Sequence, residues 1–182
     1  MSAIKRRLIE NCRICWERYG YKKTGVSELA AMTGISPASL YTFFSSKEVL
    51  FAETANDFYN GLYELIRTRK PMKPTKSDLA ESFKLAVGEI RKNKWIFNLR
   101  DDYEVFMRKL PPGYLEQDYQ RDLIDISRII DIYGVKPKAS LSEITAVIYS
   151  IVLSLYFTDV IGEQHQNAVD FLIDSAVGKL FQ

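Results

Sequence analysis

The chain has few of the residues that build disulfide frameworks, and it has no long uninterrupted apolar run. Its 182 residues include two cysteines, too few for a disulfide scaffold, which fits a reducing, cytoplasmic location. Charged residues interrupt the N-terminal stretch, so we expect no secretory signal. The longest uncharged run covers 15 residues, 144–158, whereas a membrane-spanning helix needs about 20. We therefore expect no membrane association.

Candidate ligands for a metal or a cofactor are also scarce. Cys12 and Cys15 have the C-x-x-C spacing of redox and zinc sites, but both fall on the apolar side of a predicted helix. No second cysteine pair or nearby histidine completes a tetrahedral site, so we favour core packing for both and expect no metal and no cofactor. The one histidine, His165, has no cysteine nucleophile or paired carboxylate beside it. An all-helical enzyme or cofactor carrier is therefore the least supported interpretation.

Positive charge is concentrated at the N-terminus. The whole chain is 47% hydrophobic and 26% charged, with a net charge of +2, which is ordinary globular composition. Residues 1–47 contain eight lysines and arginines against three glutamates, so the remainder carries a net charge of −3. This asymmetry is expected when one end of a protein meets a polyanion.

Helical periodicity dominates and no convincing alternating strand pattern is present, so we predict an all-α fold of about nine helices. The fourth helix starts at a capping box in which the Ser45 hydroxyl and Glu48 satisfy each other's free backbone donors. It runs to about Thr68, and two prolines in residues 70–76 then forbid continuation. The other predicted helices cover residues 4–19, 26–32, 36–43, 77–92, 94–109, 114–133, 141–161 and 166–181.

Residues 26–40 have the spacing of a helix-turn-helix. Ala30 is small where two helices meet at a steep angle, and Gly34 permits the turn between them. Ser36 and Pro37 are an N-cap hydroxyl followed by proline at the first helical position. The small core between the two helices is filled by Val26, Leu29, Ile35 and Leu40. An unrelated helical hairpin is the alternative interpretation.

The segment from Leu8 to Leu50 resembles the DNA-binding domain of the TetR family of helix-turn-helix transcriptional regulators. The matching residues are Leu8, Cys12, Trp16, Gly20, Tyr21, Thr24, Val26, Leu29, Ala30, Gly34, Ile35, Ser36, Leu40, Tyr41, Phe44 and Lys47. The rest of the chain is similar to the family in helix count and order. The resemblance implies a three-helix DNA-binding domain at residues 1–47 and a helical effector-binding and dimerisation domain at 48–182. It further implies a dimeric repressor that a small molecule releases from a double-stranded DNA operator.

The resemblance also implies that the helix after Ser36 lies in the major groove, with Tyr41 and Lys47 contacting phosphates on either side. Thr24 could contact another phosphate. The short side chains that could reach base edges are Ser36, Pro37, Ala38, Ser39 and Thr42. No Arg, Gln or Asn lies on this helix, so we expect direct base readout to be modest.

Two residues depart from the family pattern. Gly25 stands where a second hydroxyl residue is common, which removes one possible backbone contact and loosens the start of the following helix. Phe43 stands where a histidine or tyrosine is frequent, and a phenyl ring cannot donate a hydrogen bond to phosphate. The docking mode survives both changes, but we expect weaker docking.

The last two predicted helices carry the strongest apolar stripes and are the candidate homodimer interface. Paired across a two-fold axis, they would form a four-helix bundle, as the resemblance also implies. The interface residues that we predict are Val147, Ile151, Leu155, Val169, Leu172, Ile173 and Ala176. Packing within one chain is the alternative for part of each stripe.

Aromatic residues gather between residue 83 and the last helices, where the resemblance implies an effector pocket. A cavity lined by aromatics suits a mostly apolar small molecule. The pocket residues that we predict are Trp95, Phe97, Tyr103, Phe106, Tyr133 and Tyr149. For each of them, core packing is the alternative role. A body that docks a protein partner instead of a small ligand is the alternative function.

Overall fold

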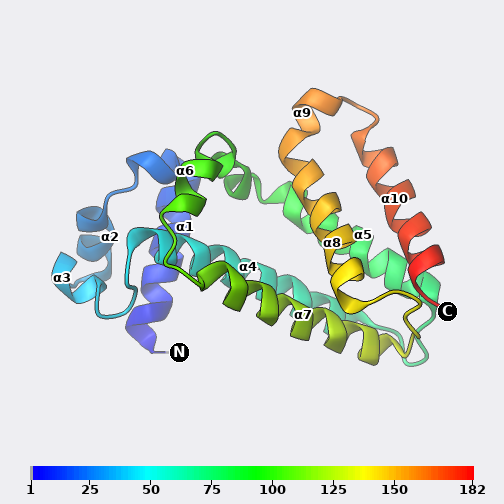
Figure 1. Ribbon diagram of the computed structural model, residues 1–182. Helices are drawn as coiled ribbons and strands as arrows, with labels where there is room; N and C mark the ends of the chain where they lie inside the picture. The colour runs from blue at the N-terminus through cyan, green and yellow to red at the C-terminus, as the bar shows by residue number, and fades with distance from the viewer. Residues whose placement is uncertain (1) are drawn as a thin grey trace. The chain divides into compact units, whose positions relative to one another are not determined.

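The structure is a computed structural model that describes residues 2–182. Every regular element in that range is a helix, apart from an isolated bridge between Pro137 and Phe181, which confirms the all-α prediction (Figure 1). The chain forms two compact units. The first unit holds the chain up to Gly61 together with Asn93–Leu115, and the second holds Leu62–Lys92 and Glu116–Gln182. The predicted boundary after residue 47 separates the DNA-binding part of the chain from the rest by function. It stays a prediction, because the two compact units are defined by packing alone.

The first unit contains α1 (Ala3–Lys23), α2 (Val26–Thr33), α3 (Pro37–Leu40) and the first part of α4 (Lys47–Arg69). The 3₁₀ helix η1 (Lys94–Asp102) and α6 (Tyr103–Arg108) complete it. Gly20 adopts φ 76° and ψ 174°, so the regular part of α1 ends near the predicted position and a further turn follows. A left-handed φ of this kind costs glycine little.

Two details of the first unit differ from the sequence expectations. The predicted capping box at Ser45 is wrong, since the Ser46 hydroxyl caps α4 by accepting from the Val49 N–H at 3.1 Å and Glu48 accepts from the Tyr21 hydroxyl. The predicted helix over 94–109 is wrong as one element, because residues 94–102 form a 3₁₀ helix. Ile96, Leu99 and Asp102 are all buried there, and steps of three suit the three residues per turn of this helix.

An aromatic cluster forms the core of the first unit, built from Trp16, Tyr21, Phe51, Trp95 and Phe106. The Trp16 ring lies 4.8 Å from both the Phe51 and Trp95 rings, measured between centroids. The Tyr21 ring packs edge-on against Phe51 at 5.2 Å and Phe106 at 5.4 Å. Edge-to-face aromatic pairs at these separations add to the stabilisation gained by burying the rings. The cluster joins α1, α4, η1 and α6 into one unit.

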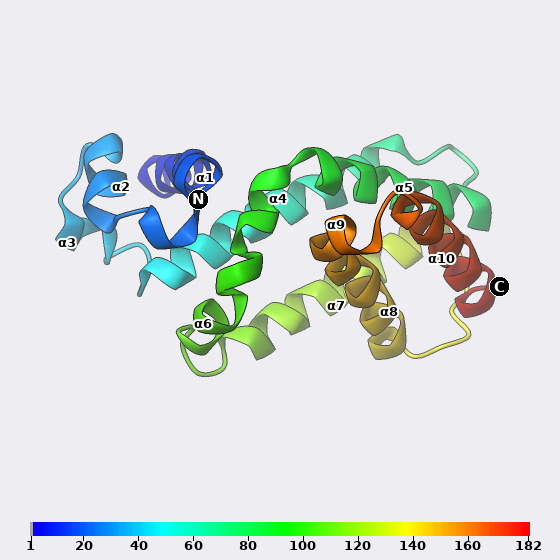
Figure 2. The same cartoon turned by 90° about the horizontal axis from the view of Figure 1, so that it is seen from above.

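The second unit contains the rest of α4 with α5 (Lys76–Lys92), most of α7 (Tyr114–Tyr133), α8 (Leu141–Ser154) and α10 (His165–Leu180). The short helices η2 (Leu155–Phe157) and α9 (Thr158–Ile161) connect the last two. α10 packs against both α5 and α8 (Figure 1 and Figure 2). The Ser140 N-cap and Glu143 form a complete capping box at the start of α8.

The predicted single helix over 141–161 is broken. The segment Leu141–Ile161 is long and apolar enough to cross a membrane by length and composition, and 22% of its most apolar window is buried. The structure divides it into α8, η2 and α9. The Ser154 hydroxyl donates back to the Ile151 carbonyl at 2.7 Å, and the Thr158 hydroxyl donates to the Leu155 carbonyl at 2.9 Å. Both bonds lie beside the 3₁₀ helix that separates α8 from α9.

His165, at the first position of α10, is 2% exposed and hydrogen-bonded on both ring nitrogens. Burial, and to a smaller extent the Arg91 charge, lower its pKa from the usual value near 6.5. The unfolded chain therefore binds a proton at a pH where the folded chain still excludes it. The stability contributed by the neutral ring is present above about pH 6.5 and is lost as the pH falls below that value.

We expect the free energy of unfolding, measured by urea titration, to fall as the pH is lowered from about 7.5 to about 5.5. His165→Gln keeps a donor and an acceptor but does not titrate, so it should flatten this dependence. Since His165 is the one histidine of the sequence, the difference between the two proteins isolates its contribution. Equal slopes for both proteins would contradict the assignment.

Candidate nucleic-acid interface

The helix-turn-helix is built by a left-handed cap between α2 and α3. Gly34 adopts φ 76° and ψ 33°, and its N–H bonds back to the carbonyls of Ala30 and Ala31. The Ile35 N–H reaches the Ala30 carbonyl at 3.0 Å, which completes the hydrogen-bond pattern of a glycine-terminated helix. Ala30 and Leu29 are completely buried where the helices meet. The sequence expectation for this turn therefore agrees with the geometry.

The predicted recognition helix is shorter than expected, since α3 ends at Leu40 and turns cover the residues up to Phe43. The Ser36 hydroxyl caps it by accepting from the Ser39 N–H at 3.1 Å, and it also contacts the Ser39 hydroxyl at 2.9 Å. The outer face of α3 and the following turn is accessible to a partner. Its exposed residues are Ser36, Pro37, Ala38, Tyr41 and Thr42, with Ser39 partly exposed.

Two side chains of α1 hold the end of α2 in place. Arg7 donates to the Thr33 carbonyl at 2.6 Å, and the Asn11 amide donates to the Thr33 hydroxyl at 3.0 Å. The Thr33 hydroxyl in turn donates to the Leu29 carbonyl at 2.7 Å. Arg7 is exposed and still ties α1 to the end of α2 through this hydrogen bond. Sequence reasoning missed this role because residues 7 and 33 become neighbours only after folding.

Lys47 lies at the start of α4, as predicted, but its amine is held by the protein. The Nζ atom donates to the Tyr21 carbonyl at 2.6 Å and lies 4.4 Å above the Tyr21 ring. Burial lowers the pKa of Lys47, and the neighbouring Glu48 carboxylate opposes that shift. An ammonium group has three donors, so the amine can hold the end of α1 and still meet a phosphate. That phosphate contact remains a prediction.

The predicted phosphate contact of Thr24 has weaker geometric support. Thr24 is 1% exposed, and both its hydroxyl and its N–H donate to the Gly20 carbonyl, at 2.8 and 3.3 Å. Its donors are therefore committed within the chain. Gly25 is the N-cap of α2 and supplies no side-chain bond, as expected from the missing hydroxyl. Phe43 is partly exposed beside the buried Phe44.

Some basic residues of the first unit contact other side chains of the unit. Lys22 forms an ion pair with the buried Asp102 at 2.5 Å, and Lys5 lies 5.1 Å from the centre of the Phe44 ring. Arg6 and Lys23 are exposed at opposite ends of α1. They are the better candidates for long-range attraction to phosphate, because charges in solvent act through the field around the protein.

Both cysteines are core residues. Cys12 is completely buried, and burial raises the pKa of its thiol to about 12. Burial also raises the pKa of Cys15, whose sulfur lies 3.4 Å from the Met32 sulfur. The thiolate is the form that binds metals and attacks disulfides, so these protonated thiols act as small apolar side chains between α1 and its neighbours.

The six residues predicted to line an effector pocket are divided between the two units. Trp95 and Phe106 are buried in the aromatic cluster of the first unit. Phe97 and the exposed Tyr103 belong to the same unit but not to the cluster. Tyr133 is buried in the second unit, where its hydroxyl bonds to Ser82, and Tyr149 is exposed and bonds to Asp122. The prediction that all six share one pocket therefore finds no support in their positions.

The residues predicted for the dimer interface also divide. Leu155, Val169 and Ile173 are at most 3% exposed and pack within the second unit. Leu172 is exposed, whereas Val147, Ile151 and Ala176 are partly exposed. The structure leaves Leu172 and further apolar side chains of α8, η2, α9 and α10 exposed. These are Leu153, Phe157, Val160, Ile161, Phe171 and Leu172, and we call them the apolar face.

Comparison with known proteins supports the DNA-binding assignment of the N-terminal segment. Residues 8–54 match the family model described as bacterial regulatory proteins of the tetR family. No curated protein sequence matches the chain.

Solved structures with the same fold cover nearly the whole chain. The transcriptional repressor QsdR of R. erythropolis, a TetR-family protein, has a TM-score of 0.65 at 14% identity over 96% of this chain and 94% of its own. A putative TetR-family regulator from Rhodococcus sp. has a TM-score of 0.65 at 15% identity over 97% of this chain and 100% of its own. The regulator FadR from Bacillus subtilis, solved with stearoyl-CoA, reaches 0.62 at 13% identity over 96% of this chain and 98% of its own.

The N-terminal match, the capped turn before α3 and the all-helical body agree with one another. The chain has the fold of TetR-family transcriptional regulators, and its residues 8–54 match that family's DNA-binding domain.

Proposed function

We propose that the protein is a dimeric repressor that releases its operator when its C-terminal unit binds a small molecule. The observation that carries the proposal is the exposed face of α3 and the turn after it, held by Gly34, Arg7 and the Ser36 cap. Short side chains on this face can approach base edges, while Tyr41 and the Lys47 amine reach for phosphates on either side. One structural neighbour, FadR, was solved with stearoyl-CoA, which supports a ligand-responsive body.

A DNA-binding head this small needs a second copy, because its short side chains give modest specificity for bases. Two heads on one operator must be held about 34 Å, or a multiple of that distance, apart. The exposed side chains of the apolar face favour such pairing, since exposed apolar side chains that gather on one surface mark interaction sites. Phe171 is 69% exposed and Val160 is 75% exposed, and burying both against a second copy would remove apolar area from water.

DNA binding is tested with the DNA upstream of the protein's own gene. We expect fluorescence anisotropy to detect binding at about 50 mM salt, and the affinity to fall about a thousandfold or more by about 200 mM, because several phosphate contacts release counterions. An unrelated fragment of equal length serves as the control. A flat salt response, or equal affinity for both fragments at every salt concentration, would contradict the proposed interface.

Tyr41→Phe should weaken operator binding about tenfold, because a hydrogen bond to a charged phosphate contributes roughly 1.5 kcal/mol or more. Tyr41 is 50% exposed, so the thermal midpoint should not change. Tyr19→Phe, which removes the same hydroxyl from an exposed tyrosine of α1, is the matched control and should bind as the wild type does. The proposed role of Tyr41 fails if the two variants bind alike.

Phe171→Asp should convert the dimer into monomers, because a charge at the centre of an apolar interface loses its hydration without gaining a partner. Sedimentation velocity measures the change in mass, and anisotropy should show loss of operator binding. Met72→Asp places the same charge on a side chain that is 99% exposed in the same unit and should leave both properties intact. A Phe171→Asp protein that remains dimeric rules out the apolar face as the interface.

A further inference from the structure

A group of polar side chains lies within the second unit, where four helices contribute to it. It consists of Arg91 at the end of α5, Ser154 at the end of α8, Thr158 in α9 and His165 at the start of α10. We call it the Arg91 cluster. The Arg91 Nη2 atom lies 2.9 Å from the His165 Nδ1 atom, and the His165 Nε2 atom lies 3.2 Å from the Ser154 hydroxyl.

The hydrogen bonds fix the charge of the histidine. A guanidinium group can only donate, so His165 Nδ1 accepts from Arg91 and the ring proton lies on Nε2, facing the Ser154 hydroxyl. The Thr158 hydroxyl lies 3.1 Å from Nδ1, and its own proton points to the Leu155 carbonyl. His165 is therefore neutral, and every partner of Arg91 in the cluster is uncharged.

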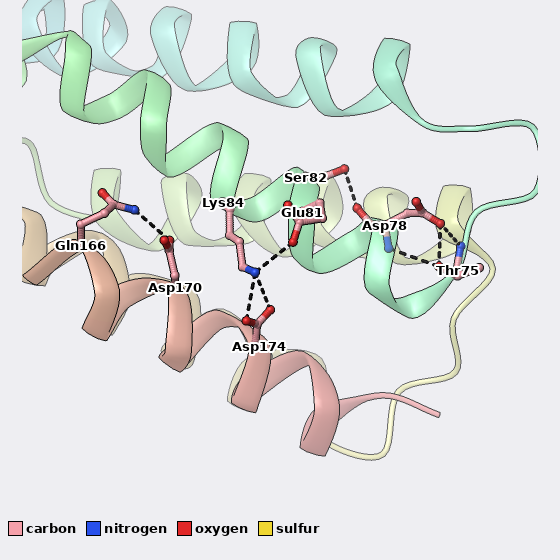
Figure 3. A network of polar contacts seen from close by, with 8 residues as sticks. All are labelled: Thr75, Asp78, Glu81, Ser82, Lys84, Gln166, Asp170 and Asp174. Atoms are coloured by element: carbon pink, nitrogen blue, oxygen red, sulfur yellow. Dashed lines mark hydrogen bonds and ion pairs between the residues drawn. The ribbon is translucent and has the colours of Figure 1, made fainter.

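Within the part of the chain that the structure describes, Arg91 has no ion pair like the one that Lys84 makes between α5 and α10. Its Nε atom is buried and makes no hydrogen bond within residues 2–182, and the structure gives it no ion pair in that range. Lys84, two turns earlier on α5, contacts both Glu81 and Asp174 (Figure 3). Asp170, the acidic residue of α10 whose charge acts on Arg91, instead accepts from Gln166 at 2.8 Å (Figure 3).

The surroundings of Arg91 favour an anion over a neutral group. Burial lowers the pKa of Arg91, which means that the charged form is held at a cost. No acidic residue lies in the first turn of α10, so the positive end of that helix dipole adds to the guanidinium charge. The residue is partly exposed, which leaves it within reach of a solute.

We propose that the Arg91 cluster binds the oxyanion head of the effector, a carboxylate or a phosphate. The planar guanidinium presents parallel N–H donors that match two oxygens of either group, and the Ser154 and Thr158 hydroxyls can turn to meet the anion. The assignment rests on the proposed sensor function of this unit. It names the chemical class of the ligand: a small molecule with an anionic end.

The test uses the full chain without DNA, with inorganic phosphate, octanoate and the uncharged octanamide as probes. Isothermal titration calorimetry should detect phosphate or octanoate, and a ligand that binds the folded state should also raise the thermal midpoint. Octanamide should bind at least about tenfold more weakly than octanoate, because it lacks the charge that strengthens hydrogen bonds to Arg91. Binding of phosphate alone would assign the site to phosphate, and binding of octanoate alone to carboxylate.

Three variants locate the binding. Arg91→Gln should weaken anion binding about tenfold or more, and Arg91→Lys should weaken it less because a point charge remains without the planar fork. Lys92→Gln removes the same charge from the next residue, whose amine pairs with Glu89 at 2.7 Å, and should bind as the wild type does. Circular dichroism and the unliganded thermal midpoint check that each variant is folded.

Anion binding that survives Arg91→Gln in a folded protein, or equal binding of octanoate and octanamide, overturns the assignment. So does the absence of binding by both anions. A second measurement separates this result from the proposed function. If anion binding depends on Arg91 but does not release operator DNA, the anion site is supported and the proposed release by a ligand is contradicted. If a ligand releases operator DNA without any dependence on Arg91, the release is supported and the anion site is contradicted.

Discussion

The aromatic cluster around Trp16 is the interaction on which the DNA-binding unit depends. Three short helices cannot bury enough apolar surface by themselves, and here the indole of α1 is enclosed by Phe51 of α4 and Trp95 of η1. The segment 93–115, distant in the sequence, thereby becomes part of the core beneath the helix-turn-helix. Lys22 and the buried Asp102 add an ion pair between the same segments.

This packing gives two of the aromatic residues predicted for a pocket, Trp95 and Phe106, a role in the core of the first unit. Composition shows that Trp95 and Phe106 are large and apolar, but it does not show which surface covers them. In the structure that surface is α1, through Trp16 and Tyr21. Aromatic side chains in this core stabilise the DNA-binding unit. Replacing one of them by alanine would leave a cavity and lower the free energy of unfolding by about 3–5 kcal/mol.

Local features were predictable from the sequence, and features that depend on tertiary contacts were not. Glycine adopts a left-handed φ at little cost, and serine caps helices through its own hydroxyl. The turn at Gly34 and the cap at Ser36 were therefore predicted correctly. Ser45 and Ser46 are the same residue type and can both cap a helix. Which of them does so depends on tertiary contacts that the local sequence does not show. Leu155 and Leu172 have the same apolar character, yet one is 2% and the other 47% exposed. The helical period shows that a stripe exists, but not which part of it the neighbouring helices cover.

The recognition surface has no Arg, Gln or Asn side chain for reading bases, so other parts of the protein must contribute to operator binding. In the proposed dimer, the short side chains of α3 leave phosphate contacts to supply much of the affinity, while the spacing of the two heads adds to the specificity. Such a regulator is sensitive to small changes in spacing, because a shift of either head breaks several phosphate contacts at once. A ligand in the second unit then needs only to bind one spacing better than the other, since differential affinity is all that can shift the equilibrium. Arg91, which makes no ion pair within residues 2–182, lies among α5, α8, α9 and α10. An anion bound there would therefore contact helices that carry the apolar face.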